Sequence, residues 1–383
     1  MKRCCIYILM AVLSAVSCRK EPVVQPAPEE ISFAAPAVAE TKSVLITDVA
    51  GMVSGENERA YSVFASRYIP GPDGSITRHQ KFMNDVKVYS RKTDDLWSPW
   101  QYDSDPQTDG VQHVFWSPGA IHKFFAIYPY YDSSNDLYDL GISYSIDEEK
   151  HALKVTGKHD AGNSQKLIIC TGHNGNELCP DILYGVRAFT DPYQVGENRD
   201  AVNFTMQHAL SAVSFELRNA SVYDITKIQT QFMTGFANAS DHVWVSERGA
   251  EWATPRTVED DDHKFKVPDF TAGNIAPGQY HKTEGDYWCT MLMIPQNFGT
   301  YASSPSFTFT VTLDTDNTGD SAKDETKNYT INFQDYAVNS VAEHAYTYLP
   351  GYHYVYTFNV TAKNITCDVN IVPWVEDEYI ELN

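Results

Sequence analysis

The feature that most constrains the fold is a long series of short segments in which apolar and polar residues alternate. These segments are rich in Tyr, Phe, Val, Ile and Thr, which pack well on a pleated, half-buried surface. Gly, Pro, Asn, Asp and Ser cluster between them, and no long stretch of the sequence has the 3.6-residue apolar period of a helix. Clear examples are YSVFAS (61–66), DVKVYS (85–90), HKFFAIYP (122–129) and SFTFTVTL (306–313). Many short strands separated by turns predict an all-β protein built from β-sandwiches.

The length of the chain and the number of strand segments predict two domains. A chain of 383 residues with this strand density is too long for one sandwich. The polar, turn-rich stretch TDPYQVGENRDA (190–201) interrupts the strand pattern, which then resumes. We therefore expect two sandwiches, residues 43–198 and residues 199–383, with their boundary inside this stretch.

The first 17 residues have the features of an export signal. Lys2 and Arg3 precede an apolar run over residues 4–16, which is shorter than the about 20 residues of a membrane span and has the length of a signal-peptide core. Small residues then lead to Cys18, as in the processing site of bacterial lipoproteins, where the cysteine becomes the lipidated first residue. The alternative is an ordinary secretory signal cut near the same point, with Cys18 unmodified. Both alternatives predict that residues 1–17 are removed.

The mature chain is expected to be strongly acidic. The formal charge of −21 becomes −23 when Lys2 and Arg3 leave with the signal. Such a surface repels polyanions, so we expect no nucleic-acid partner. Residues 19–30 (RKEPVVQPAPEE) are rich in proline and charge, which is typical of a flexible tether between a lipid and a folded domain.

The cysteines do not predict a disulfide scaffold. Beyond Cys18 the chain has four, too few to replace a hydrophobic core in a protein of this size. Cys170 and Cys179 are close enough in sequence for one local disulfide, but a bridge also requires a Cα separation that sequence does not give. A single bridge and two free thiols are the alternatives at this pair.

The sequence contains no motif that predicts catalysis. GxSxG, HExxH, a Walker loop and a GxGxxG following a strand are all absent. We therefore expect a protein that is not an enzyme and that needs no cofactor.

One stretch has the spacing of a calcium-binding loop. In DTDNTGDSAKDE (314–325), Asp314, Asp316, Thr318 and Glu325 stand at ligand positions 1, 3, 5 and 12 of that loop. The flanking segments have strand patterns, whereas the loop usually joins two helices. We therefore favour a metal-free acidic hairpin loop, with a Ca²⁺ site as the alternative.

Ten stretches, taken in order, resemble the fimbrillin-like family of type V pilus subunits, which are lipoproteins of Gram-negative gut and oral bacteria. The stretches are EISF, ETKS, YSVFAS, KFMNDVKV, VFWSPGAIHKFFAIYPYY, DILYG, FTMQHALSAVSFEL, MLMIPQ, LPGYHYVYTFNV and IVPW. The resemblance covers nearly all of the mature chain. It implies two tandem transthyretin-like β-sandwiches, a lipid on Cys18 that holds the precursor at the outer membrane, and a place as a stalk, tip or anchor subunit in a cell-surface fimbrium that serves adhesion.

The resemblance also implies a mechanism of assembly. A trypsin-like protease cuts beyond the first strand, residues 18–42 leave with the lipid, and another pilus subunit inserts a strand into the empty groove. The removable strand of this chain matches EISFAA, in which Ile31 and Phe33 point to the same side. The cut matches Lys42 in ETKSV, with Arg59 in GENERAY as the alternative. A trypsin-like enzyme would also cut either residue in a merely flexible segment.

A second function is consistent with the aromatic content of 13%. A lipid-anchored protein that binds glycans and never polymerises could stack sugars on Trp97, Trp100 or the YPYY stretch (128–131). The same residue types also fill sandwich cores, which we favour here. The pilus function requires that residues 19–42 fill a groove in the intact protein, whereas the glycan function predicts a dispensable, disordered tether and a solvent-facing row of aromatic rings.

Overall fold

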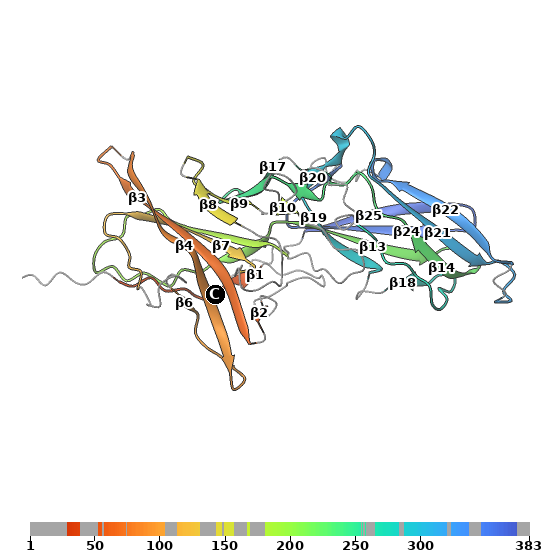
Figure 1. The fold of residues 1–383 in the computed structure, drawn as a ribbon, viewed down its shortest axis with the longest axis horizontal. Helices are drawn as coiled ribbons and strands as arrows, with labels where there is room; N and C mark the ends of the chain where they lie inside the picture. The colour runs from red at the N-terminus through yellow and green to blue at the C-terminus, as the bar shows by residue number, and fades with distance from the viewer. Residues whose placement is uncertain are drawn as a thin grey trace, which may run out of the picture.

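The computed structural model describes residues 29–38, 53–55, 57–73, 75–103, 113–130, 143–147, 149–156, 167–168, 181–253, 255, 257, 265–282, 287–319, 323–336 and 346–373. These ranges contain β-strands, two short 3-10 helices and no α-helix, which confirms the predicted all-β fold. The 3-10 helices are η3 (Phe298–Thr300) and η5 (Phe333–Tyr336). Figure 1 shows an elongated molecule, with the strands coloured orange to yellow at one end and those coloured blue at the other.

The N-terminal sandwich is built around one long sheet with the order β1-β12-β11-β7-β3-β4-β5, in which β2 also pairs with β3 and β6 with β4. The neighbours along this order are antiparallel except β1 and β12, which run parallel. The strands are β1 (Ala37–Val38), β2 (Val53–Gly55), β3 (Glu58–Pro70), β4 (Ile76–Thr93), β5 (Leu96–Trp97), β6 (Gln101–Asp103), β7 (Ile121–Tyr128), β11 (Leu183–Phe189) and β12 (Thr205–His208).

A second sheet of the N-terminal sandwich has the order β17-β16-β9-β8 and includes a hairpin from the other half of the chain. Its strands are β8 (Ser143–Asp147), β9 (Ala152–Thr156), β16 (His242–Ser246) and β17 (Gly249–Ala253). Val243 lies opposite Val155 in the antiparallel β16–β9 ladder. Nearby, β10 (Leu167–Ile168) pairs with β15 (Ala239–Ser240).

These pairings correct the boundary that we expected between residues 198 and 199. Strand β12 lies beyond that point but belongs to the N-terminal sheet, and the β16–β17 hairpin returns to the N-terminal sandwich. The physical reason is burial, because Val243 and Val245 pack into an apolar core together with Leu153 of β9. Alternation in the sequence identifies a strand and its buried face, but it does not identify the strand's partner.

The C-terminal sandwich has two main sheets. One has the order β18-β13-β24-β25 with β19 also on β13, and the other has the order β14-β21-β22. Its strands are β13 (Ser211–Asn219), β14 (Asp224–Thr230), β18 (Tyr280–His281), β19 (Cys289–Met293), β20 (Gln296–Asn297), β21 (Ser306–Asp314), β22 (Glu325–Asn332), β23 (Thr347–Tyr348), β24 (Tyr352–Val360) and β25 (Ile365–Pro373). Strands β13 and β24 are parallel, and β20 pairs with β23.

Three apolar cores stabilise the molecule. The C-terminal core lies between the two sheets of its sandwich, where β21 buries every second side chain, among them Phe307 and Phe309. The long N-terminal sheet buries both of its faces, because Val63 and its neighbour Phe64 on β3 enter two different cores. The core that contains Phe64 also contains Leu292 of β19, so it joins the two sandwiches. Each fully buried side chain of this size contributes about 1.5–3 kcal/mol.

Candidate functional site: the groove that holds residues 29–38

Residues 29–38, here called the N-terminal segment, lie in a groove of the N-terminal sandwich. The first wall of this groove is formed by residues 113–116. Ile31 N donates a hydrogen bond to Val114 O (2.8 Å), and Trp116 N donates to Glu29 O (2.9 Å). Glu30 forms an antiparallel bridge with Phe115. The segment therefore adds one strand to this wall.

The second wall is formed by residues 199–206 and pairs with the segment in parallel. Val202 N donates to Ser32 O (2.8 Å), and Ala34 N donates to Val202 O (3.0 Å). Further along, Ala37 N donates to Phe204 O (2.9 Å), and β1 then pairs with β12. The segment thus supplies backbone hydrogen bonds to both walls, as an interior strand of a sheet does.

Two side chains of the segment fill the apolar floor of the groove. Ile31 is fully buried and Phe33 is 6% exposed, while Ser32 between them faces solvent. The Phe33 ring centroid lies 5.6 Å from that of Tyr102 and 6.2 Å from that of Phe124, both in edge-on contacts. Such edge-on aromatic contacts are a favoured geometry. Ile31 and Phe33 therefore enter the core together.

Polar contacts hold the start of the segment. The Glu30 carboxylate lies 2.7 Å from His113 Nδ1 and accepts a hydrogen bond from the Tyr102 hydroxyl (3.1 Å). Burial, with a smaller contribution from the charge of Glu30, raises the pKa of Tyr102 to about 12. The phenol is therefore a stable hydrogen-bond donor at neutral pH. A crevice of about 440 Å³ runs beside Ile31 and Phe33 and is lined on its other side by Trp100 and Tyr102, among others.

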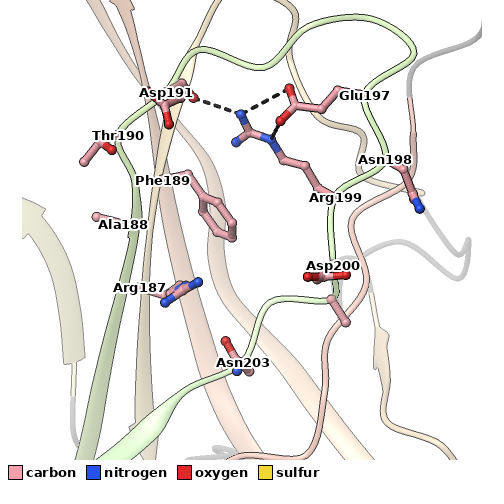
Figure 2. A pocket seen from close by; sticks show the side chains of 11 residues that line it. Arg187, Ala188, Phe189, Thr190, Asp191, Glu197, Asn198, Arg199, Asp200 and Asn203 are labelled. Atoms are coloured by element: carbon pink, nitrogen blue, oxygen red, sulfur yellow. Dashed lines mark hydrogen bonds and ion pairs between the residues drawn. The ribbon is translucent and has the colours of Figure 1, made fainter.

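The preceding residue, Glu29, is held by the second wall and by the loop that leads to it. Arg199 N donates to Glu29 Oε2 (2.9 Å), and Glu29 N donates to the Tyr193 hydroxyl (3.1 Å). The Arg199 side chain lines a separate pocket of about 400 Å³, which Figure 2 shows together with Asp191 and Glu197. His122 is buried behind the first wall, with its ring 5.0 Å from that of Trp116.

Sequence reasoning identified Ile31 and Phe33 but not the residues that hold them. Trp116, Tyr193 and Arg199 all contact the segment from positions more than 80 residues away in the chain. Only one signal pointed to this region, namely the turn-rich stretch 190–201, and we interpreted it as a domain boundary. In the structure this stretch forms the loop before the second wall and the beginning of that wall, a position that the strand pattern could not indicate.

Several predicted site residues lie outside the described ranges. Cys18, Lys42, Cys170 and Cys179 are among them, so lipidation, cleavage at Lys42 and the Cys170–Cys179 disulfide stay predictions. Among the cysteines that the structure does describe, Cys289 and Cys367 are free thiols, and burial raises the pKa of Cys367 to about 12.

Arg59, the alternative cleavage residue, lies inside a paired strand. It is opposite Val53 of β2 on one side and Ser90 of β4 on the other. Its guanidinium carbon lies 3.7 Å from the centroid of the Trp97 ring. A protease needs an accessible, extended substrate segment, so this placement counts against cleavage at Arg59.

The acidic loop at residues 314–325 connects β21 and β22. Asp314 Oδ2 accepts a hydrogen bond from Gly319 N (3.1 Å), and Asp316 Oδ1 accepts from both the backbone N–H (3.1 Å) and the hydroxyl (2.6 Å) of Thr318. The hydrogen bonds from Thr318 are the main reason that the pKa of Asp316 is lowered.

Two lysines accompany the acids of this loop. Lys323 Nζ lies 3.2 Å from Asp316 Oδ2, and Lys327 Nζ lies 3.3 Å from Glu325 Oε1. Across the described ranges, no group of three or more His, Cys, Asp or Glu side chains is arranged to hold a metal ion. The loop therefore uses its carboxylates within the hairpin, and calcium binding stays an untested alternative.

The aromatic residues considered for glycan binding do not form a solvent-facing row in the parts of the chain that the structure describes. Trp97 is 36% exposed, but Arg59 lies over its ring. Trp100 packs against Tyr61 at 5.3 Å, and Tyr128 is 3% exposed in the core. These rings stabilise the fold rather than offer a flat surface to a sugar.

The described ranges contain no helix with the length and apolar character needed to cross a membrane.

The groove is the candidate site, because backbone hydrogen bonds from two walls and the burial of Ile31 and Phe33 all hold the same segment of the chain.

Comparison with known proteins identifies the family. The sequence profile of the fimbrillin-like family matches residues 92–374, so the chain belongs to this family and the predicted resemblance is confirmed. No curated protein sequence is significantly similar to the chain.

Solved structures support the fold. A fimbrial protein from Bacteroides vulgatus has a TM-score of 0.51 and 13% sequence identity, over 90% of this chain and 99% of that one. Two others align less well. The tip fimbrial protein Mfa3 from Porphyromonas gingivalis has a TM-score of 0.32 and 13% identity, over 82% of this chain and 94% of that one. A fimbrial assembly protein from Parabacteroides distasonis has a TM-score of 0.37 and 11% identity, over 90% of this chain and 100% of that one. Only the first comparison bears on the fold.

Proposed function

We propose that this protein is a structural subunit of a surface fimbria that assembles by strand exchange after proteolysis. In this proposal the precursor is a lipoprotein held at the outer membrane through Cys18. A trypsin-like protease cuts after Lys42, the N-terminal segment leaves, and a strand of another pilus subunit takes its place in the groove. The finished subunit serves cell adhesion, and no step requires a metal, a cofactor or a nucleic acid.

The observation that carries the proposal is the way the N-terminal segment is held. It is hydrogen-bonded to both walls and buries Ile31 and Phe33, although it belongs to the first part of the mature chain and is far in sequence from both walls. A segment with this placement can be exchanged for another strand without breaking any covalent connection within the remaining fold.

Removal of the segment would leave a groove that requires a new occupant. The amides of Trp116 and Val202 and the carbonyls of Val114, Val202 and Phe204 would lose their hydrogen-bond partners. The sites of Ile31 and Phe33 would become an apolar slot. Unpaired strand edges and exposed apolar surface both favour pairing with another chain, so an incoming strand would restore both kinds of interaction.

The intact segment would also prevent early assembly. As long as residues 29–38 fill the groove, no strand of another subunit can enter. The predicted cut at Lys42 lies after the segment, and the predicted lipid at Cys18 lies before it. One cleavage would therefore open the groove and release the subunit from its lipid at the same time.

The test is limited trypsin treatment of a soluble form that spans residues 19–383. We expect a new N-terminus at Ser43, followed by a ladder of oligomers on an unheated denaturing gel, because strand-exchanged sheets unfold slowly. The matched variants are Lys42→Gln, which should block both the cut and the ladder, and Arg59→Gln, which should block neither. A clean cut at Lys42 that gives only monomer would contradict assembly by strand exchange.

A further inference from the structure

Arg199 lies in an aromatic enclosure at the end of the groove. Its side chain is 6% exposed, and the guanidinium carbon lies 5.1 Å from the ring centroid of Trp116, 5.3 Å from that of Phe189 and 5.5 Å from that of Tyr193. We name these four residues the Arg199 box. A buried guanidinium among aromatic rings is strongly held, because its planar cation interacts favourably with the ring faces.

Hydrogen bonds fix the guanidinium inside the box. Nε lies 3.1 Å from Glu197 Oε1, and Nη2 donates to the carbonyl oxygen of Asp191 (2.9 Å). Figure 2 shows both contacts above the ring of Phe189. Nη1 is buried and has no hydrogen-bond partner among the described residues. Glu197 and Asp191 thus fix the position of the guanidinium between the three rings.

Three members of the box hold the first residue of the N-terminal segment. Glu29 N donates to the Tyr193 hydroxyl (3.1 Å), Glu29 O accepts from Trp116 N (2.9 Å), and the Glu29 carboxylate accepts from Arg199 N (2.9 Å). The contacts of Glu29 thus come from both walls and from the loop before the second wall. The contact with the Glu29 side chain is made by the backbone N–H of Arg199, and a carboxylate accepts such a hydrogen bond more strongly than an uncharged oxygen does.

The box also connects the two walls without using the segment. Trp116 belongs to the first wall and Arg199 to the second, while Tyr193 is tied to the turn after the first wall. Tyr193 N donates to Ala120 O (2.9 Å), and Gly119 N donates to Tyr193 O (2.8 Å). None of these contacts involves residues 29–38. They would persist when the segment leaves, whereas the hydrogen bonds that the walls share through the segment would be lost.

We propose that Arg199 is a positioning residue that keeps the empty groove open, and that its box selects a strand with an acidic side chain at the place of Glu29. This inference rests on the proposed function. Without such a brace, the apolar slot of an empty groove would close, because its walls would gain by burying their own surface. With the brace, the walls keep the spacing of about 4.8 Å on each side that an incoming strand requires.

The proposal defines the chemistry of the partner strand. Glu29, Ile31 and Phe33 alternate along the segment, and all three meet the floor or the box. The partner is therefore a strand of a second subunit with an acid, an apolar residue and an apolar residue at the places of Glu29, Ile31 and Phe33. The position of Ser32 faces solvent and is free to vary, whereas the position of Glu30 meets His113 and Tyr102.

The test measures the binding of a fluorescent peptide with the sequence of residues 29–38 to the cleaved protein. The protein is cut after Lys42 and freed of its N-terminal fragment in mild denaturant, and peptide affinity is then read from fluorescence anisotropy. Arg199→Met is the variant, and Arg187→Met is the matched control. Arg187 lines the same pocket and stacks on Phe189 at 5.3 Å, but no contact joins it to the segment. A second peptide carries Glu29→Gln.

We expect Arg199→Met to weaken the binding of the native peptide about tenfold or more, and Arg187→Met to weaken it less than about threefold. The Glu29→Gln peptide should bind the unmodified protein about fivefold more weakly than the native peptide, and this difference should shrink in Arg199→Met. A merely structural role of Arg199 would lower the affinity for both peptides equally, so the coupling between the two changes is the decisive readout.

Each other outcome has a distinct meaning. Equal effects of Arg199→Met and Arg187→Met would overturn the positioning role, and equal affinities of the two peptides would overturn the selection of an acid. If Arg199→Met does not fold, the peptide affinity of Arg199→Lys tests the positioning role. The affinities of the two peptides for the unmodified protein then test the selection of an acid. Failure of the unmodified cleaved protein to bind any peptide would contradict the proposed function itself, which separates that failure from failure of the Arg199 proposal.

Discussion

The two sandwiches of this protein differ in where their parts come from. Among the described residues, the buried core of the C-terminal sandwich draws only on those between Val213 and Val360, so that region of the chain supplies its own core. The N-terminal core instead depends on Ile31 and Phe33, which reach it from a segment at the start of the mature chain. The N-terminal sandwich also includes the β16–β17 hairpin from the other half. One sandwich is therefore self-sufficient, and the other contains an exchangeable part.

Packing chemistry does not explain this difference. Phe33 meets Phe124 at 6.2 Å in the N-terminal core, and Phe215 meets Phe307 at 5.8 Å in the C-terminal core. Both cores are buried and aromatic. The two cores differ in which parts of the chain supply their strands. The apolar side chains of Ile31 and Phe33 in the exchangeable N-terminal segment are buried, like those of the strands that stay in the fold.

The strongest way to break the comparison is to remove the N-terminal segment. In a chain that starts at residue 43, we expect the N-terminal sandwich to lose about 5 kcal/mol or more, because two large buried side chains and the hydrogen bonds to both walls disappear. The C-terminal sandwich should retain its stability. Hydrogen exchange should show lost protection at Trp116 and Val202, with that of Phe309 unchanged. Equal loss of protection in both sandwiches would contradict the distinction.

A single substitution in each core should sharpen the comparison. Phe33→Ala and Phe309→Ala should each cost about 3–5 kcal/mol, the usual range for a buried phenylalanine. The effect of Phe309→Ala should appear as a lower unfolding midpoint of the C-terminal sandwich. The effect of Phe33→Ala should appear, once Lys42 is cut, as release of the N-terminal fragment at least about 100-fold faster. Similar release rates for Phe33→Ala and the unmodified protein would show that the burial of Phe33 does not retain the segment.

Acid should destabilise both sandwiches through one histidine in each. Burial lowers the pKa of His122 to about 4, with help from Arg199 and Arg67, and burial alone lowers the pKa of His353 to about 4. Because these values lie below the ordinary 6.5, the stabilisation is complete above pH 6.5 and is lost as the pH falls toward 4. Each histidine should account for about 2–3 kcal/mol of that loss.

The measurement is denaturant unfolding at pH 7 and pH 4.5, with His122→Gln and His353→Gln as variants that should lose less stability at low pH. Added salt should reduce the pH dependence that comes from His122 more than that from His353, since only His122 has charged neighbours among the causes of its shift. An equal response of the two histidines to salt would contradict this assignment.

The smallest effect is expected at the acidic loop of the C-terminal sandwich. Because Lys323 and Lys327 already accompany Asp316 and Glu325, we expect millimolar Ca²⁺ to shift the melting temperature of that sandwich by less than about 1 °C. Asp316→Asn should not change the response. A clear stabilisation by Ca²⁺ that Asp316→Asn abolishes would instead establish the calcium site.

The sequence was sufficient to predict which side chains of a strand are buried. Alternation placed Phe307 and Phe309 of β21 on one face, and it placed Ile31 and Phe33 on the same side of the segment; all four are buried. The buried face could be predicted because the two-residue period of a strand is a local property of the backbone.

The partners of the strands and the Arg199 box could not be predicted. The pairing of β16 with β9, and the parallel pairing of β13 with β24, join residues that are far apart in the chain. Arg199 stands in a polar stretch whose composition is that of an exposed loop, yet its side chain is buried among the rings of Trp116, Phe189 and Tyr193. Such an environment depends on the assembled fold and leaves no local pattern.

The crossing hairpin has a mechanical consequence. The two residues Ala209 and Leu210 connect β12 of one sandwich to β13 of the other, and both are buried. The β16–β9 ladder provides a second connection in parallel with that link. Tension that pulls the two sandwiches apart must therefore shear the β16–β9 ladder as well as stretch the link at Ala209 and Leu210. A rod made of such units would transmit load through sheets, and its joints would be stiff.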